Sequence, residues 1–154
     1  MSCYEILDLK HSLAKSSDEE SANKIIRTFA IDHFAKMMND LHQDMMIMDL
    51  DDLKGTTDSL YGPFSFVASD EMNQLVREMF KASKEGDRQK LIDTYPIFLE
   101  KCLVFKKELE DYIKEKISGL DLEEHLAETK KKFVVGEMEG ENKDNPVCAA
   151  CNIF

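Results

Sequence analysis

Four residues between positions 51 and 58 combine charge with helical spacing. Residues three and four apart are neighbours on a helix, so Asp51, Lys54, Gly55 and Asp58 share one side of it. We expect this side to face solvent. A glycine inside an exposed helical face costs about 1 kcal/mol relative to alanine. We infer that its missing side chain leaves room for the backbone of a partner. The pattern therefore indicates a charged docking surface.

The helix that carries this surface is predicted to bury its opposite side. Apolar positions recur there at the spacing of an amphipathic helix, and they are Met46, Leu50, Leu53, Thr57 (through its methyl group) and Leu60. A turn near residues 42–44 is expected to precede the helix. Gly62 and Pro63 are expected to end it, because proline removes a backbone donor and disfavours helix in the residue before it.

The rest of the chain also shows helical spacing of apolar residues, without the alternation typical of strands. The further predicted helices cover residues 4–15, 17–41, 69–85, 88–118 and 121–133. Their ends are marked by a capping box that starts at Ser17, by the N-cap Ser69, by a stop and restart at Gly86 and Asp87, and by Asp121.

These elements predict an all-α protein. We expect residues 1–135 to form an antiparallel four-helix bundle with an additional N-terminal helix, in which Pro96 kinks the last long helix. At 154 residues the chain is long enough for one sizeable core. Glycine, glutamate, asparagine and proline become frequent over residues 136–154, so we expect a flexible C-terminal tail there.

The segment Leu53-Lys54-Gly55-Thr56-Thr57 resembles the H-x-L-K-G-S-S signature of histidine-containing phosphotransfer (HPt) domains. The likeness covers residues 4–117, because residues 17–41 resemble the second helix of the family and residues 86–113 resemble its last hairpin helix. In that family the histidine carries a phosphoryl group between the receiver domains of two-component relays. In this chain the position of the histidine is Asp51, and Gly62 stands one residue later than the corresponding glycine of the family.

The replacement of the histidine by Asp51 is predicted to abolish phosphotransfer. A neutral imidazole nitrogen attacks the acyl phosphate of a receiver and holds the phosphoryl group as a phosphoramidate. A carboxylate is a poor nucleophile and repels the incoming group, and Asp49, Asp52 and Asp58 add further negative charge. We therefore expect no catalytic residue, no cofactor and no enzymatic activity.

The resemblance implies that a surface for docking a receiver is retained. Its residues are expected to be Ile47, Met48, Asp51, Lys54, Gly55 and Asp58. Lys54 matches the lysine that offers positive charge to phosphoryl oxygens in the family. Here its expected partners are Asp51, Asp58 or the acidic pocket of a receiver. Gly55 leaves room for a receiver loop. Ile47 and Met48 supply an apolar rim, unless Ile47 packs under the neighbouring helix.

The favoured hypothesis is a pseudo-HPt, a non-catalytic monomer that docks the receiver domain of a response regulator or of a hybrid sensor kinase. It would compete there with true phosphotransfer proteins. One alternative is a helical scaffold without a relay role. A second is an active relay through His42, expected at a helix end, or through His11, whose surrounding segment mimics the signature without its glycine. A third is a coincidental match in an ordinary bundle. His33 and His125 are interpreted as packed or surface histidines.

Composition excludes some classes of partner. The formal net charge is −11 and the isoelectric point is about 4.8, so nucleic acid, whose phosphates would repel the chain, is not an expected partner. No apolar run approaches the roughly 18 residues of a membrane span, and the first residues lack the apolar region of a signal peptide. We therefore expect a cytoplasmic protein.

The cysteines suggest two roles. Cys102 lies on an apolar helical face and is expected in the core. Cys148 and Cys151 form a C-x-x-C motif without a second ligand pair, so no metal site is expected. The last four residues, from Cys151 to Phe154, fit the C-a-a-X prenylation pattern, with geranylgeranyl favoured by the final residue. Palmitoylation of Cys148 would supply the second signal that stable attachment needs. Membrane association is expected only with this lipidation, and a chance match is the other interpretation.

Overall fold

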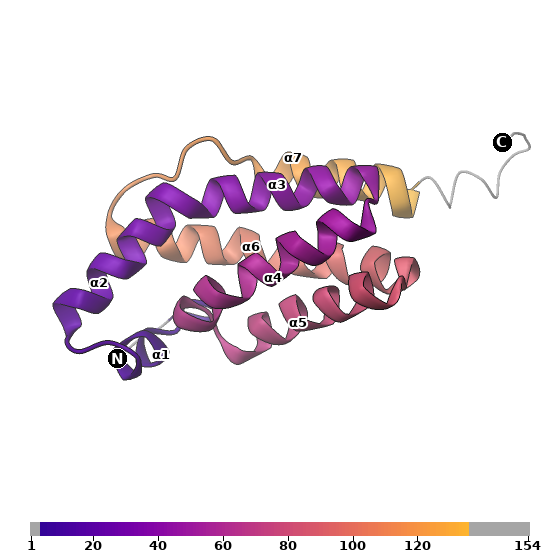
Figure 1. Cartoon of the computed structure of the whole chain (residues 1–154). Coiled ribbons are helices and arrows are strands. Elements are labelled where there is room, and N and C mark those ends of the chain that lie inside the picture. The colour runs from indigo at the N-terminus through magenta and orange to yellow at the C-terminus, as the bar shows by residue number, and fades with distance from the viewer. Residues whose placement is uncertain (1–3, 136–154) are drawn as a thin grey trace, which may run out of the picture.

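The computed structural model describes residues 4–135 and is all-helical over that range (Figure 1), which confirms the predicted class. Its helices are α1 (Leu9–Ala14), α2 (Glu19–Thr28), α3 (Phe34–Ile47), α4 (Leu50–Val67), α5 (Asp70–Glu85), α6 (Arg88–Ile113) and α7 (Leu122–Thr129). Two π-helical turns, η1 (Phe29–His33) and η2 (Lys130–Val135), join α2 to α3 and follow α7. The predicted tail, its two cysteines and the C-a-a-X motif lie outside the described residues.

The helices pack side by side along one another. Helices α2 and α3 form one continuous arm, and the chain then reverses through α4, α5 and α6 (Figure 1). Helix α4 packs against α3 and α5, and α6 packs against α5 and α7. Helix α7 lies along α3 and contacts it through Asn39 and His42, so a segment late in the sequence returns to the second half of the first long arm (Figure 1). Within residues 4–135, no helix combines the length and apolar content needed to cross a lipid bilayer.

One apolar core connects all the long helices, and aromatic rings form its centre. The Phe64 ring of α4 lies 5.7 Å from the Phe29 ring and 5.6 Å from the Phe105 ring, centroid to centroid. The rings of Phe34 and Phe98 lie within 6.3 Å of it. All five are buried. Cys102 is also buried, as predicted, and burial raises the pKa of its thiol well above the usual value.

The N-terminal segment is shorter as a helix than predicted. Helix α1 begins only at Leu9, and the residues before it are held by the carboxylate of Glu108. This carboxylate accepts the backbone N–H groups of Glu5, Ile6 and Leu7 at 2.6, 2.9 and 2.8 Å. Three donors on one carboxylate replace the hydrogen bonds that a helix would provide. The side chains of Ile6 and Leu7 are buried, whereas Leu13 is exposed.

The turn before the central helix lies later than predicted. Residues 42–44 are inside α3, and the chain reverses at Met48 and Asp49. Met48 adopts the left-handed region at φ 59°, and its N–H bonds back to the carbonyl of Asp44 at 2.8 Å. Asp49 then caps α4 by accepting the N–H of Asp52 at 3.1 Å. Met46, predicted on the central helix, therefore belongs to α3.

The prediction that Gly62 and Pro63 end the central helix is wrong. Helix α4 continues through Pro63 to Val67. Gly62 has no Cβ to clash with the proline ring, so the usual restriction on the residue before proline is relieved. Ser65 donates to the Gly62 carbonyl at 2.7 Å. Phe64 and Val67 are both buried, and their burial keeps the following turn helical.

Most of the other helix ends match their signals. Ser69 accepts the N–H of Met72, Gly86 takes the left-handed region at φ 75°, and the side chains of Asp87 and Asp121 cap α6 and α7. Two predictions are wrong. Asp18, not Ser17, caps α2, since its carboxylate accepts the N–H of Ser21 at 2.7 Å. Helix α6 ends at Ile113 with Lys114 in the left-handed region, short of the predicted end at residue 118.

Candidate functional site

The candidate site begins at the tight reversal between α3 and α4. This reversal places Asp51 in the first turn of α4, whereas the sequence predicted a helix that had already started at Met46. A helix N-terminus carries partial positive charge, which favours the Asp51 carboxylate. The site is thus at one end of α4, next to the end of α3.

The five residues of the Leu53–Thr57 motif divide into two groups. Leu53 and Thr57 are buried, and the Thr57 hydroxyl bonds to the Leu53 carbonyl at 2.7 Å. Thr56 donates to the Asp44 carboxylate at 2.5 Å and so ties α4 to α3. Folding therefore accounts for three of the five residues. Lys54 and Gly55 remain, and both are exposed.

Lys54 makes no ion pair with another of the described residues, although Asp51 and Asp58 flank it on the same face. The predicted pairing with either aspartate is therefore not found. Lys54 shares an exposed face with the carboxylates of Asp51 and Asp58 but forms an ion pair with neither of them. Its ammonium group can therefore bind an anionic group of a partner. The structure brings together all four residues of the predicted charged surface on the exposed side of α4.

Packing within the folded chain does not require a glycine at position 55. A Cβ added there meets no atom within 4 Å. The backbone is helical, so the left-handed freedom of glycine is not used either. A glycine that lowers helix stability by about 1 kcal/mol without a packing reason points to a requirement outside the folded chain.

Gly55→Ala is therefore expected to raise the free energy of unfolding by about 1 kcal/mol. Urea titration monitored by circular dichroism measures this change. Gly62→Ala is the matched control, because Gly62 is also exposed and helical with open space around it. It precedes Pro63, where a Cβ disfavours helix, so no gain is expected there. A loss of stability in Gly55→Ala would show that the glycine serves the fold.

The apolar rim is only partly as predicted. Ile47, the last residue of α3, is 65% exposed, so the alternative in which it packs under a neighbouring helix is wrong. Met48 is half-buried and packs against the core, so it offers less surface than predicted. Sequence reasoning missed Tyr61, which lies one turn beyond Asp58 and is 44% exposed. Its ring faces the Arg77 guanidinium at 5.9 Å.

Tyr61 and Asp58 line a hollow of about 250 Å³ together with residues of α5, among them Phe80. The hollow lies beside the charged face and extends it with apolar surface. The spacing of Tyr61 after Asp58, together with the exposed position of α4, is the signal that could have identified it.

The start of α4 is strongly acidic. Asp49 raises the pKa of Asp52 by charge repulsion, and burial, Asp44 and Asp51 add to the effect. Phosphate would be repelled by this cluster. The exposed ammonium of Lys54 and the apolar rim therefore lie next to a cluster of carboxylates.

The histidines differ in how accessible they are to a partner. His42 is only 6% exposed and lies inside α3, not at a helix end as predicted. Its ring nitrogens are engaged by Tyr95 and Glu128. A receiver has no access to such a side chain, which argues against a relay through His42. The ring of His11 lies 3.3 Å from the Ala68 carbonyl, and His33 is exposed.

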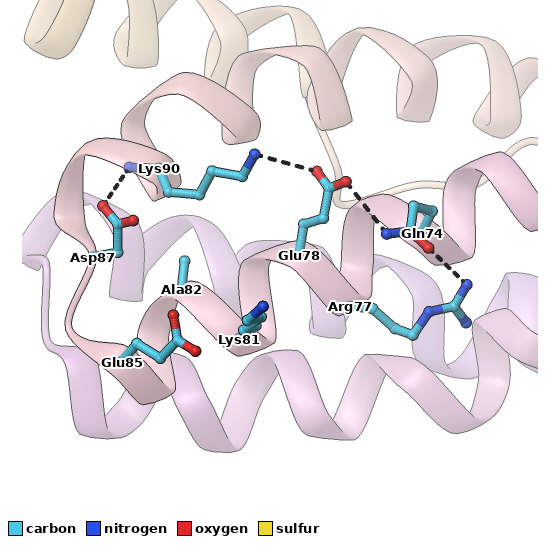
Figure 2. A pocket seen from close by; sticks show the side chains of 8 residues that line it. All are labelled: Gln74, Arg77, Glu78, Lys81, Ala82, Glu85, Asp87 and Lys90. Carbon is cyan, nitrogen blue, oxygen red and sulfur yellow. Dashed lines mark hydrogen bonds and ion pairs between the residues drawn. The ribbon is translucent and has the colours of Figure 1, made fainter.

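A second hollow, between α5 and α6, holds mixed charges (Figure 2). Lys90 and Gln74 both approach the Glu78 carboxylate, at 3.8 and 3.3 Å, and Arg77 donates to Gln74 at 3.0 Å. These polar groups satisfy one another across an open surface, and no buried unpaired group points into the hollow (Figure 2). We assign it no site.

Comparisons with models of known protein families, with curated proteins and with solved structures find no match for this chain. Its function is therefore inferred from its own residues.

Proposed function

We propose that this chain is a pseudo-HPt, a non-catalytic module that docks the receiver domain of a response regulator or hybrid sensor kinase and thereby competes with true phosphotransfer proteins. One observation carries the proposal. Of the residues that resemble the HPt signature, Leu53, Thr56 and Thr57 serve the fold, whereas Lys54 and Gly55 are exposed without an internal role. They are the two that the resemblance assigns to docking.

The arrangement of helices is compatible with this proposal. The arm of α2 and α3 together with α4, α5 and α6 would be the four helices of an HPt-like bundle, with α1 as the additional N-terminal helix. Helix α7 would then be an addition that packs on the outside of the bundle beside α3. The signature residues would lie on α4, as the resemblance requires.

Docking is proposed to use charge at the centre and apolar contact at the rim. The Lys54 ammonium would enter the acidic pocket of the receiver, where a phosphoryl group or carboxylates offer strong acceptors. Gly55 would allow a receiver loop to approach the α4 backbone. Ile47 at one end and Tyr61 at the other would bury apolar surface against the partner.

Asp51 makes the complex unproductive in this proposal. It occupies the position from which an imidazole would attack, but its carboxylate is exposed and other carboxylates, those of Asp49, Asp52 and Asp58, lie close to it in the sequence. A docked receiver would keep its phosphoryl group while its docking surface is covered. The result is inhibition of the relay through competition.

The test is a binding titration against a panel of receiver domains, each phosphorylated with acetyl phosphate. Lys54→Ala is expected to weaken the best binding by about 10-fold or more, since hydrogen bonds to charged groups contribute about 1.5–3 kcal/mol. Gly55→Gln is expected to weaken it at least as much through bulk alone, because glutamine is uncharged and favours helix. Lys107→Ala, which removes an exposed lysine of α6, is the matched control and should bind like wild type.

Two outcomes contradict the proposal. The first is that no receiver binds, with or without phosphorylation. The second is that a receiver binds equally well to wild type, Lys54→Ala and Gly55→Gln, which would indicate a helical scaffold that uses another surface.

A further inference from the structure

Two histidines far apart in the sequence stack on each other between α3 and α7. The rings of His42 and His125 lie 3.9 Å apart, centroid to centroid, with 11° between their planes. Glu128, one turn after His125 on α7, places its carboxylate 2.7 Å from His42 Nε2. One possible ligand atom from each of His42, His125 and Glu128, a ring nitrogen or a carboxylate oxygen, lies within 4.8 Å of the other two.

The hydrogen bonds around His125 fix which of its nitrogens carries the proton. Asn39 donates through Nδ2 to the Gly119 carbonyl at 2.8 Å, and a carbonyl can only accept. The Asn39 oxygen is therefore the atom that faces His125 Nε2, at 2.8 Å, and it accepts a hydrogen bond from the N–H group at that position. The lone pair of the neutral ring is then on Nδ1, which is buried and has no hydrogen-bond partner.

His42 has a partner that suits either tautomer. The Tyr95 hydroxyl lies 2.9 Å from Nδ1, and a hydroxyl both donates and accepts. Burial raises the pKa of Tyr95 well above its usual value, so this group keeps its proton. Without an ion, Nε2 donates to Glu128. When Nε2 binds an ion, the imidazole proton is carried by Nδ1 instead. The Nδ1–H group then donates a hydrogen bond to the Tyr95 hydroxyl, and the ring stays neutral.

We propose that His42, His125 and Glu128 form a site for one divalent transition metal ion of the Zn²⁺ class that links α7 to α3. Imidazole nitrogens and a carboxylate are ligands that Zn²⁺ binds at about 2.0–2.2 Å. Tyr95 and Asn39 hold the non-ligating nitrogens, as oxygen partners of metal-binding histidines commonly do. The three ligands leave a fourth position for water.

Binding requires a small local movement. A lone pair lies in the plane of its ring, so two parallel rings cannot both point at one ion between their planes. The rings must therefore tilt out of the stack. Glu128 is half-exposed, so solvent reaches its carboxylate from the α7 side.

The state of His125 suits metal binding. Burial lowers its pKa, and the neighbouring His42 lowers it further by charge repulsion, against smaller opposite effects of Glu128 and Asp121. This direction favours the neutral form of the ring.

No metal site was expected from the sequence, because the only pattern typical of metal ligands there is the C-x-x-C pair at Cys148 and Cys151. Those thiols also bind Zn²⁺, so the experiment replaces both with serine in the full-length chain. Added ZnCl₂ is expected to raise the melting temperature of this parent by roughly 5–10 °C at saturation, as ligand linkage predicts for a chain of this size. The Co²⁺ complex should show no thiolate-to-metal charge-transfer band.

Three variants in the parent background locate the site. Glu128→Gln and His125→Gln alter partly exposed side chains and are expected to fold, but to bind Zn²⁺ roughly 10–100-fold more weakly. Glu124→Gln, on the same helix and outside the cluster, should retain the shift. A parent without a zinc-dependent shift, or equal shifts in all three variants, would overturn the proposal.

Discussion

Asp51→His is expected to convert the chain into an acceptor of phosphoryl groups. Wild type should remain at background when incubated with a labelled phosphoreceiver, and the variant should exceed it by roughly 10-fold or more, because an imidazole supplies the missing nucleophile. The side chain at this position is exposed in the first turn of α4. Lys54, one turn on, would offer positive charge to the phosphoryl oxygens against the repulsion of the neighbouring carboxylates.

The label should be acid-labile, as a phosphoramidate is, and should be lost on further replacement of Lys54 by alanine. Asp58→His is the matched control. It places a histidine on the same exposed face of α4, followed at the fourth position by Gly62 but with Tyr61 in place of the lysine at the third. Equal labelling of Asp51→His and Asp58→His would show that the motif does not position the reaction. Labelling of wild type would contradict the assignment of Asp51 as a block.

Phe64→Ala is expected to lower the free energy of unfolding by about 3–5 kcal/mol, the usual cost of removing a buried phenylalanine. Its ring meets those of Phe29, Phe34, Phe98 and Phe105, so the cavity would open at the centre of the core. The prediction also tests the continuation of α4, because Phe64 follows Pro63 and enters the core only if the helix runs on.

Urea denaturation measures this change as a fall in the transition midpoint with little change in slope. Tyr61→Ala, which truncates an exposed aromatic residue of the same helix, is the control and should cost less than about 1 kcal/mol. A loss below 1 kcal/mol in Phe64→Ala would show that the ring does not connect the helices.

Local signals predicted much of the fold. The apolar spacing identified the helices, and the caps at Ser69, Asp87 and Asp121 act through side-chain bonds to nearby N–H groups. Such interactions depend on residues close in the sequence. The exposed positions of Asp51, Lys54, Gly55 and Asp58 followed from the same spacing.

Tertiary contacts decided the features that the sequence did not reveal. The reversal at Met48 uses a left-handed residue that is not glycine, so no turn signal marked it. Glu108 holds the first residues by bonds that span 101 to 103 positions. His42 and Glu128 are 86 positions apart. A pattern over neighbouring residues contains no information on such pairs.

The measurement that tests the central claim most directly maps the docking surface. The full-length chain, labelled with ¹⁵N, is titrated with the receiver domain of the panel that binds most tightly. We predict that amide shifts change mainly over residues 47–62, on the exposed side of α4, and that they remain unchanged at Glu85, Asp87 and Lys90, at the far end of the hollow between α5 and α6 (Figure 2). Changes confined to another face, or the absence of changes with every receiver, would contradict the account.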